Sequence, residues 1–232
     1  MEKKDSAAYN DKKSNQEKKK PKGEVKFQIS LNEEQKLAKQ VILENAVTVI
    51  KGMAGSGKTL VAAQVGLDLL FKREVERIVI ARPMVARTDM GALPGSAEDK
   101  LHPWLIPIYA NLYLLYNKMS IDKLVEEGVI EILPFQFMRG RTLTDSFVII
   151  DEAQNITHEE MEMVIGRLGK ESKMVFCGDN SQIDLKNKKD SGLDFLKTIE
   201  GRVPGLKNVV LLQNHRHPIV KEILDVYREY RD

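Results

Sequence analysis

The stretch from Gly52 to Thr59 matches the phosphate-binding pattern G-x-x-x-x-G-K-[ST]. The apolar β-branched run 47–50 precedes it, and the proline-free run 60–70, rich in helix formers, follows it. A strand, a glycine turn and a helix start in this order present backbone N–H groups to an anion. We expect Lys58 to reach the outer phosphates of a nucleotide and the Thr59 hydroxyl to help hold Mg²⁺. The alternative is a glycine-rich turn with a stray lysine. The predicted nucleotide cradle comprises Gly52, Met53, Ala54, Gly55, Ser56, Gly57, Lys58, Thr59 and Leu60.

Two carboxylates follow the apolar run 147–150, namely Asp151 and Glu152. A run without polar alternation is typical of a strand buried on both faces of a parallel sheet, and parallel strands deliver their carboxyl ends to one edge. We expect Asp151 to bind Mg²⁺, directly or through water, and Glu152 to orient and deprotonate an attacking water. Two acidic residues at the start of a helix would give the same sequence pattern. The catalytic interpretation is favoured because the same chain also contains the glycine loop.

Two further apolar runs, 174–177 and 209–212, also end in polar residues. After the first run, Gln182 has an amide that could bond both a γ-phosphate and the attacking water, although Gly178-Asp179 could be a simple turn. After the second run, Arg216 is a candidate for stabilising charge on the transferred phosphoryl group, with pairing to a nearby carboxylate as the alternative. Upstream, Gln35 lies one turn into a predicted helix and could bond an adenine edge with its amide.

From about residue 27 onward, apolar runs alternate with helical patterns. The expected strands are 47–52, 77–82, 129–133, 147–151, 173–177 and 208–213. The expected helices are 32–44, 58–72, 102–118, 121–127, 157–169, 191–199 and 217–230. This alternation predicts an α/β fold, a mostly parallel sheet flanked by helices on both faces. The connection 82–100, rich in Gly, Pro and Ala, is long enough to suggest a functional loop.

Composition narrows the class of protein. At 232 residues and 42% hydrophobic content the chain suits one globular domain with extensions or two very small ones. No apolar run approaches the roughly 18 residues that span a bilayer, so no membrane partner is expected. The single cysteine, Cys177, lies in an apolar run, which favours a buried structural thiol in a reducing cytoplasm. No His/Cys cluster has metal-ligand spacing.

The formal net charge is only +2, but the first 25 residues carry eight lysines against five acids. This segment has almost no apolar residues, so we expect a disordered lysine-rich tail at 1–26 and a folded domain at 27–232. The tail is interpreted as solubilising, with a weak nucleic-acid-binding arm as the alternative.

Taken together, the motifs resemble superfamily 1 helicase ATPase cores. The chain has a Gln ahead of the glycine loop, D-E-A-Q at 151–154, G-D-x-x-Q at 178–182 and Q-N-x-R at 213–216. The linking segments are similar to the PhoH family of phosphate-starvation-associated ATPases. These segments are Ala81-Arg82-Pro83, Leu93-Pro94-Gly95, Glu98-Asp99-Lys100, the run 138–143, Gln182-Ile183-Asp184-Leu185 and Arg216-His217-Pro218. The resemblance covers roughly residues 28–230.

The resemblance implies a RecA-like P-loop NTPase that hydrolyses ATP with Mg²⁺. It assigns the adenine-reading role to Gln35, the γ-phosphate arginine to Arg216, and the catalytic roles argued above to Lys58, Glu152 and Gln182. Arg139 and Arg141 match a family signature just before the D-E-A-Q strand. We expect them to reach a neighbouring subunit's nucleotide or a nucleic acid, with a scaffold role in that loop as the alternative.

Superfamily 1 helicases carry a second RecA-like domain that closes over ATP, and this sequence ends too soon for one. We therefore expect a homo-oligomer, for example a hexameric ring, in which a neighbour completes the site. By analogy we also expect a helicase-like coupling to RNA or single-stranded DNA, with candidate contacts at Arg82, Arg87, Trp104, Tyr109 and Tyr113. Core packing is the alternative for Trp104 and Tyr109. A P-loop kinase and a nucleotide-switched binding module are the alternative functions.

Overall fold

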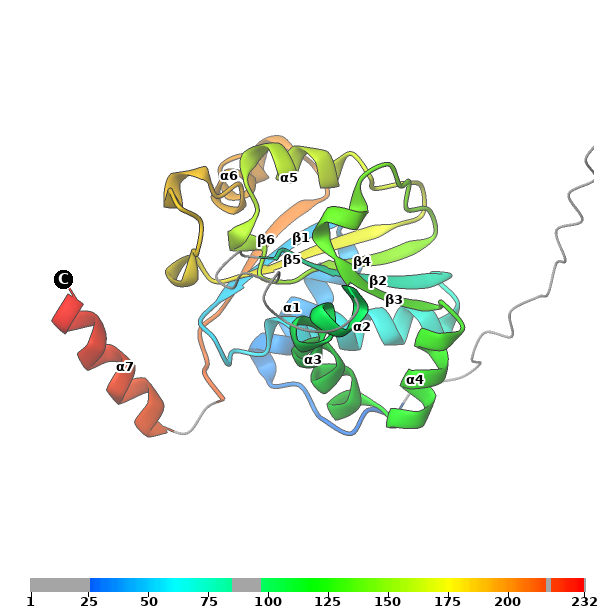
Figure 1. Ribbon diagram of the computed structural model, residues 1–232, viewed down its shortest axis with the longest axis horizontal. Coiled ribbons are helices and arrows are strands. Elements are labelled where there is room, and N and C mark those ends of the chain that lie inside the picture. The colour runs from blue at the N-terminus through cyan, green and yellow to red at the C-terminus, as the bar shows by residue number, and fades with distance from the viewer. Residues whose placement is uncertain (1–25, 85–96, 216–217, 232) are drawn as a thin grey trace, which may run out of the picture.

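The structure, a computed structural model, describes residues 26–84, 97–215 and 218–231 (Figure 1). Six strands form one sheet in the order β3-β2-β4-β5-β1-β6, and every pairing between them is parallel. The strands are β1 (Val47–Gly52), β2 (Arg77–Arg82), β3 (Ile130–Pro134), β4 (Ser146–Ile150), β5 (Lys173–Gly178) and β6 (Leu206–Leu211). The predicted α/β RecA-like P-loop architecture with a parallel sheet is confirmed, and each strand begins within two residues of its predicted start.

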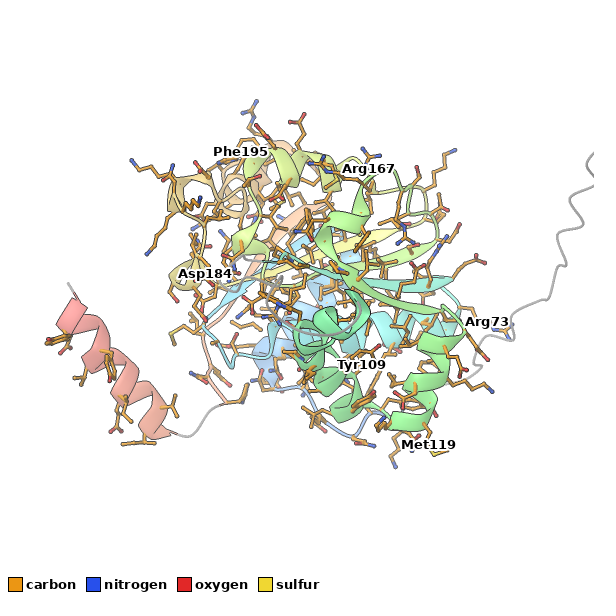
Figure 2. The ribbon with its side chains drawn as sticks, viewed as in Figure 1. Arg73, Tyr109, Met119, Arg167, Asp184 and Phe195 are labelled. Carbon is orange, nitrogen blue, oxygen red and sulfur yellow. The ribbon has the colours of Figure 1, made fainter. Side chains whose placement is uncertain are left out.

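Helices cover both faces of this sheet (Figure 1). One face carries α1 (Glu33–Glu44), α2 (Lys58–Lys72), α3 (Ala97–Leu115) and α4 (Lys118–Glu126). The other carries α5 (His158–Ile165) and α6 (Leu193–Thr198), while α7 (Pro218–Arg231) projects away from the body. Figure 2 shows Tyr109 of α3 and Phe195 of α6 on opposite sides of the sheet. Short 3₁₀ turns lie at Phe135–Met138, Ala153–Asn155, Asn180–Gln182, Lys188–Asp190 and Glu200–Arg202.

The central strands are buried on both faces, as their uninterrupted apolar runs predict. In β4, Phe147 and Ile149 join the core beneath α1–α4, whereas Val148 and Ile150 join the core beneath α5 and α6. This alternation is the two-residue period of a strand. Because neither face of β4 meets water, its carboxyl end is held rigidly where the next two residues, both acidic, begin.

Most predicted helices differ by a few residues from their bounds in the structure, and two of them differ most. The predicted helix 102–118 is interrupted because Asn117 caps a new helix, its side chain accepting a hydrogen bond from the Ser120 N–H. The predicted helix 157–169 ends at Ile165, and the Gly169 N–H then bonds the Leu143 carbonyl at 2.8 Å. A Cβ at Gly169 would lie 2.6 Å from that oxygen, so the close approach needs glycine. The predicted strand 147–151 also ends one residue early, at Ile150.

The predicted lysine-rich tail falls on residues outside the described ranges, apart from its last residue. Within the described ranges, we find no helix with both the length and the apolar character needed to cross a membrane.

Candidate nucleotide-hydrolysis site

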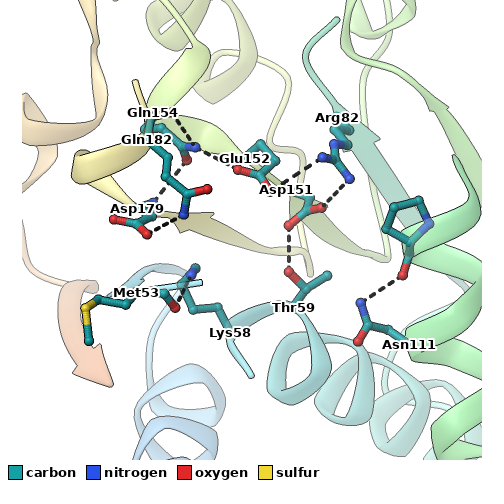
Figure 3. A network of polar contacts seen from close by, with 11 residues as sticks. Met53, Lys58, Thr59, Arg82, Asn111, Asp151, Glu152, Gln154, Asp179 and Gln182 are labelled. Carbon is teal, nitrogen blue, oxygen red and sulfur yellow. Dashed lines mark hydrogen bonds and ion pairs between the residues drawn. The ribbon is translucent and has the colours of Figure 1, made fainter. Parts of the chain in front are cut away.

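The carboxyl ends of β1, β4 and β5 meet at one edge of the sheet, because these strands are parallel neighbours in the order β4-β5-β1. Two hydrogen bonds connect the three ends. The Thr59 hydroxyl donates to Asp151 Oδ1 at 2.6 Å (Figure 3). The Ala54 N–H donates to Asp179 Oδ2 at 3.0 Å. The glycine loop, the acid pair and the Gly178–Gln182 turn therefore surround one cavity of about 610 Å³.

The glycine loop has the backbone that a phosphate cradle requires. Gly55 and Gly57 adopt φ values of 88° and 84°, in the left-handed region that favours glycine. A Cβ at Gly57 would lie 2.5 Å from Gln35 Nε2. Helix α2 begins directly after Gly57 with no side chain capping its first N–H groups. Uncapped amides at the start of a 15-residue helix form an anion-binding end.

Lys58 bridges its own loop. Its Nζ donates to the carbonyl oxygen of Gly52 at 2.7 Å and to that of Met53 at 3.0 Å, the second of which Figure 3 shows. The same ammonium lies at the cavity that Asp151, Glu152 and Gln182 also line. A cation held this way is already directed across the mouth of the loop, where the outer phosphates of a nucleotide would carry negative charge.

Asp151 and Thr59 form an oxygen pair that fits Mg²⁺. Asp151 is only 6% exposed, and this burial raises the pKa of its carboxyl above the ordinary value. The neighbouring Glu152 raises it further, while the Thr59 hydroxyl and the Arg82 guanidinium oppose the shift. Within the described ranges no group of three or more His, Cys, Asp or Glu side chains could hold a metal. A carboxylate and a hydroxyl suit Mg²⁺, which takes few protein ligands and completes its shell with phosphates and water.

Glu152 is fixed by a second set of contacts. Its backbone is in the left-handed region, with φ 53°, an unusual conformation for a residue other than glycine. Its Oε2 accepts a hydrogen bond from Gln154 Nε2 at 2.7 Å (Figure 3). Gln154 is fully buried and also contacts the next strand: its Nε2 donates to the Gln182 carbonyl, and its Oε1 accepts from the Asp179 N–H. One amide thus joins the candidate base to the candidate phosphate sensor.

Gln182 points toward Asp179 in this structure, donating to its Oδ2 at 2.6 Å. Burial alone would raise the pKa of the Asp179 carboxyl, but hydrogen bonds from Ser181 and Gln182 outweigh it, so the pKa lies below the ordinary value. The same Oδ2 accepts from the Ala54 N–H. The loop amide therefore already binds an anionic oxygen.

The end of the cavity where base reading is predicted is built from α1 and the residues after β6. Gln35 is 4% exposed, and its Nε2 donates to the Ser56 carbonyl at 3.2 Å. The amide nitrogens of Asn32 and Gln35 lie 3.0 and 3.3 Å from His215 Nε2. The His215 N–H donates to the Gly55 carbonyl, which ties the end of β6 to the glycine loop. Arg216, the predicted γ-phosphate arginine, lies outside the described residues.

The other predicted arginines have different positions. Arg82 points at the acid pair of its own chain, with Nη1 3.7 Å from Asp151 Oδ2 and Nη2 3.5 Å from Glu152 Oε1 (Figure 3). Arg141 pairs with Glu131 at 2.6 Å, which is a scaffold contact within the chain. Arg139 is exposed directly after the 3₁₀ turn that follows β3. Arg87 lies outside the described residues.

The three aromatic residues that were predicted to contact nucleic acid have different surroundings. Tyr113 packs against the core and donates its hydroxyl to Asp122 at 2.6 Å. Tyr109 lies against it, with ring centroids 5.8 Å apart. Trp104 belongs to neither apolar core, and its ring lies 6.0 Å from the Arg82 guanidinium.

Sequence reasoning missed three contributors to this site: Gln154, Asp179 and His215. Each lies within one of the motifs named above, so the residue type was known from the sequence. Its role, however, depends on contacts between segments that are distant in sequence. Gln154 and Asp179 face each other across β4 and β5, and His215 reaches Gln35 across 180 residues.

Comparisons with known proteins identify the family of this chain. A family model described as PhoH-like protein matches residues 29–228. A PhoH-like protein of Synechocystis sp. is 42% identical over 191 residues, covering 81% of this chain and 58% of the relative. A PhoH-like protein of Bacillus subtilis (strain 168) is 41% identical over 179 residues, covering 76% of this chain and 56% of the relative. The chain thus spans a little over half the length of these relatives.

Among solved structures, the large terminase from a thermophilic bacteriophage is similar in fold, with a TM-score of 0.53 and 10% sequence identity. The match covers 85% of this chain and 50% of that chain. At this identity the similarity concerns the fold alone. The family model and the two relatives carry the stronger conclusion, because they extend over most of the sequence at about two identical residues in five. The chain belongs to the PhoH-like protein family.

Proposed function

We propose that this chain is a Mg²⁺-dependent ATPase in which water attacks the γ-phosphate in line. The observation that carries the proposal is the convergence of the glycine loop, the acid pair and Gln182 on one cavity. The 2.6 Å hydrogen bond between Thr59 and Asp151 links the glycine loop to the acid pair. These are the residue types that hold a triphosphate, a hard cation and a nucleophilic water.

Each side chain has a distinct role in this proposal. Thr59 and Asp151 would hold Mg²⁺, which neutralises phosphate charge when bound. Lys58 and the loop amides bind the phosphates, and Glu152 accepts the proton of the attacking water. The Gln182 amide exchanges Asp179 for the γ-phosphate and the water. Catalysis on these terms is chiefly positioning and charge stabilisation.

The adenine lies at the other end of the cavity in this proposal. Gln35 is almost fully buried there, and the neighbouring His215 ring offers a planar surface on the cavity wall. The Gln35 amide supplies both a donor and an acceptor to the edge of a base. Preference for adenine over guanine is therefore assigned to Gln35.

Release of inorganic phosphate from ATP, with and without Mg²⁺, tests the function directly. The intact chain is expected to release phosphate only with Mg²⁺, and Lys58→Ala is expected to weaken ATP binding and turnover together. Phosphate transfer to a small molecule without release to water would favour a kinase instead. Binding of ATP without turnover would favour a nucleotide-switched binding module.

We also infer coupling to RNA or single-stranded DNA. The exposed Phe137 and Arg139 lie just after β3, beside the end of β2 that carries Arg82. Exposed aromatic and basic side chains at one sheet edge are suited to bases and phosphates. The ATPase rate with and without each polymer, at several salt concentrations, decides this. No stimulation and no salt-dependent binding would exclude the coupling.

A homo-oligomer is the last part of the proposal. Helix α7 has an apolar stripe formed by Ile223, Val226, Tyr227 and Tyr230, all exposed and spaced to share one helix face. A second copy of the chain is the proposed cover, and it would bring further residues toward the open nucleotide cavity. Light scattering that finds a monomer hydrolysing ATP at full rate, independent of protein concentration, would contradict this.

A further inference from the structure

A second, smaller cavity lies behind the catalytic side chains. Its volume is about 160 Å³, and it shares Arg82, Glu152 and Gln182 with the nucleotide cavity. Its other lining residues, among those the structure describes, are Pro83, Trp104, Asn155 and Asp184. The candidate base and sensor therefore form part of the wall between two cavities, so a ligand in the second cavity would contact them from the side opposite the nucleotide.

Trp104 gives this cavity its stacking surface. It is the only tryptophan of the chain, half-buried on α3 and outside both apolar cores. The guanidinium of Arg82 lies 6.0 Å from the ring centroid, at the outer limit of a cation–π contact. As a half-buried residue that lines the cavity, Trp104 offers an indole surface on which a planar ligand could stack.

Arg82 makes only weak contacts with its three neighbours Asp151, Glu152 and Trp104. Its guanidinium nitrogens are 3.7 Å from Asp151 and 3.5 Å from Glu152, both longer than a charge-assisted hydrogen bond. Its Nε is buried without a hydrogen-bond partner among the described residues, and such a donor costs free energy where it stays unsatisfied. Small movements of this side chain would therefore exchange weak contacts rather than break strong ones.

The charges of the cavity select its ligand. The described lining residues contribute one guanidinium and the carboxylates of Glu152 and Asp184, so they offer no excess positive charge to a phosphate inside. Asn155 accepts the Asp184 N–H through its Oδ1, which leaves its amide nitrogen as a donor at the cavity wall. An aromatic face with amide and carboxylate groups at its edge suits a neutral planar ring that has hydrogen-bonding edges.

We propose that this cavity binds one base of a single-stranded nucleic acid, stacked on Trp104. The base takes the place of the Arg82 guanidinium at the ring, and Arg82 turns fully toward Asp151, Glu152 and the nucleotide. Arg82 is then a positioning residue through which nucleic acid acts on hydrolysis. The proposal rests on the ATPase function proposed above, but the binding part can be measured without turnover.

Intrinsic fluorescence provides the test, because Trp104 is the sole tryptophan. Titration of the full chain with a short oligouridine or oligodeoxythymidine is expected to quench its emission to saturation. By anisotropy of a labelled oligonucleotide, Trp104→Leu should weaken binding roughly 5- to 150-fold, the loss expected for one stacked base. Trp104→Phe should restore part of it. Phe195→Leu, at an exposed aromatic of α6 on the other face, should bind like the original chain.

The coupling of nucleic-acid binding to ATP hydrolysis is tested by a separate measurement. Arg82→Lys keeps the charge but loses the planar guanidinium, so oligonucleotide should still quench Trp104 while no longer stimulating phosphate release. Circular dichroism and binding of an ATP analogue verify that each variant is folded.

Two results would overturn the site. One is unchanged Trp104 emission at oligonucleotide concentrations that saturate binding. The other is emission that changes with protein concentration alone, which would assign the cavity to a side chain of a second copy. Quenching in a chain that releases no phosphate would reject the ATPase function while leaving the base site supported.

Discussion

The hydroxyl of Thr59 donates a hydrogen bond of 2.6 Å to Asp151 Oδ1, joining two residues that are 92 positions apart. Thr59 lies in the first turn of α2, and Asp151 directly follows the fully buried strand β4. The contact is possible because β1 and β4 run parallel on either side of β5, so that both deliver their carboxyl ends to one edge. The proposed metal site depends on this contact.

Glu152→Gln tests the assignment of the base. Glutamine keeps the size of the side chain but cannot accept the proton of the attacking water, so turnover should fall about 10²- to 10⁴-fold. ATP binding, measured by calorimetry, should be retained. Glu159→Gln is the matched control, because Glu159 is an exposed acid in the first turn of α5. Turnover that survives the change at Glu152 would show that another group is the base.

Gln154→Ala tests the link between the two halves of the site. Gln154 contacts Glu152, Asp179 and the Gln182 carbonyl, so its removal should loosen the base and the sensor together. We expect kcat to fall while KM for ATP changes little. The variant should also unfold more readily, by about 1–3 kcal/mol, because buried polar groups lose a partner. A change in KM alone would indicate a purely structural effect on the nucleotide cavity.

Gly57→Ala tests the geometry of the loop. The residue has φ 84°, and an added Cβ would meet Gln35 Nε2 at 2.5 Å. The left-handed backbone alone should cost about 1–2 kcal/mol, and displacement of Gln35 should weaken ATP binding further. Gly201→Ala is the control, since its Cβ would meet no heavy atom within 4 Å. Calorimetry and thermal unfolding should find the first variant impaired and the second close to the original chain.

Asp68→Asn tests how α1 is fastened to α2. Asp68 pairs with Lys39 at 2.7 Å and with Lys72 at 3.3 Å, and its side chain is 11% exposed. The variant should lose about 1–3 kcal/mol in the free energy of unfolding at neutral pH. Glu33→Gln, which breaks an exposed pair with Lys36, should lose less than about 1 kcal/mol.

The Asp68 effect should depend on pH with a defined sign. Burial alone would raise the pKa of this carboxyl, but Lys39 and Lys72 hold it below the ordinary value of 3.8. The folded state thus favours the carboxylate, and its contribution to stability is complete above pH 3.8. The difference between the original chain and Asp68→Asn should shrink as the pH falls below 3.8 through the folded-state pKa. A difference that is constant down to acid unfolding would contradict the ion pairs.

Some of the fold could be predicted because the relevant signals are local. The strands at 47–52 and 77–82 are centred on the β-branched run 47–50 and the apolar run 78–81, and such runs favour burial on both faces of a sheet. Helix α2 was predicted with its correct bounds because the glycine loop defines its start. The end of α5 was missed, since Gly169 is needed for its approach to Leu143 from a distant segment, not for its own propensity.

By itself the sequence determined which side chains could serve phosphate chemistry, because the glycine loop, the acid pair and Gln182 occur in motifs whose spacing along the chain is fixed. Only the tertiary structure decided what those side chains face. Strand order brings Arg82 to the acid pair and leaves Trp104 beside it, and it sets Gln154 between Glu152 and Gln182. These relationships join segments far apart along the chain, and no local pattern encodes them, since they arise from the crossovers that arrange parallel strands in space.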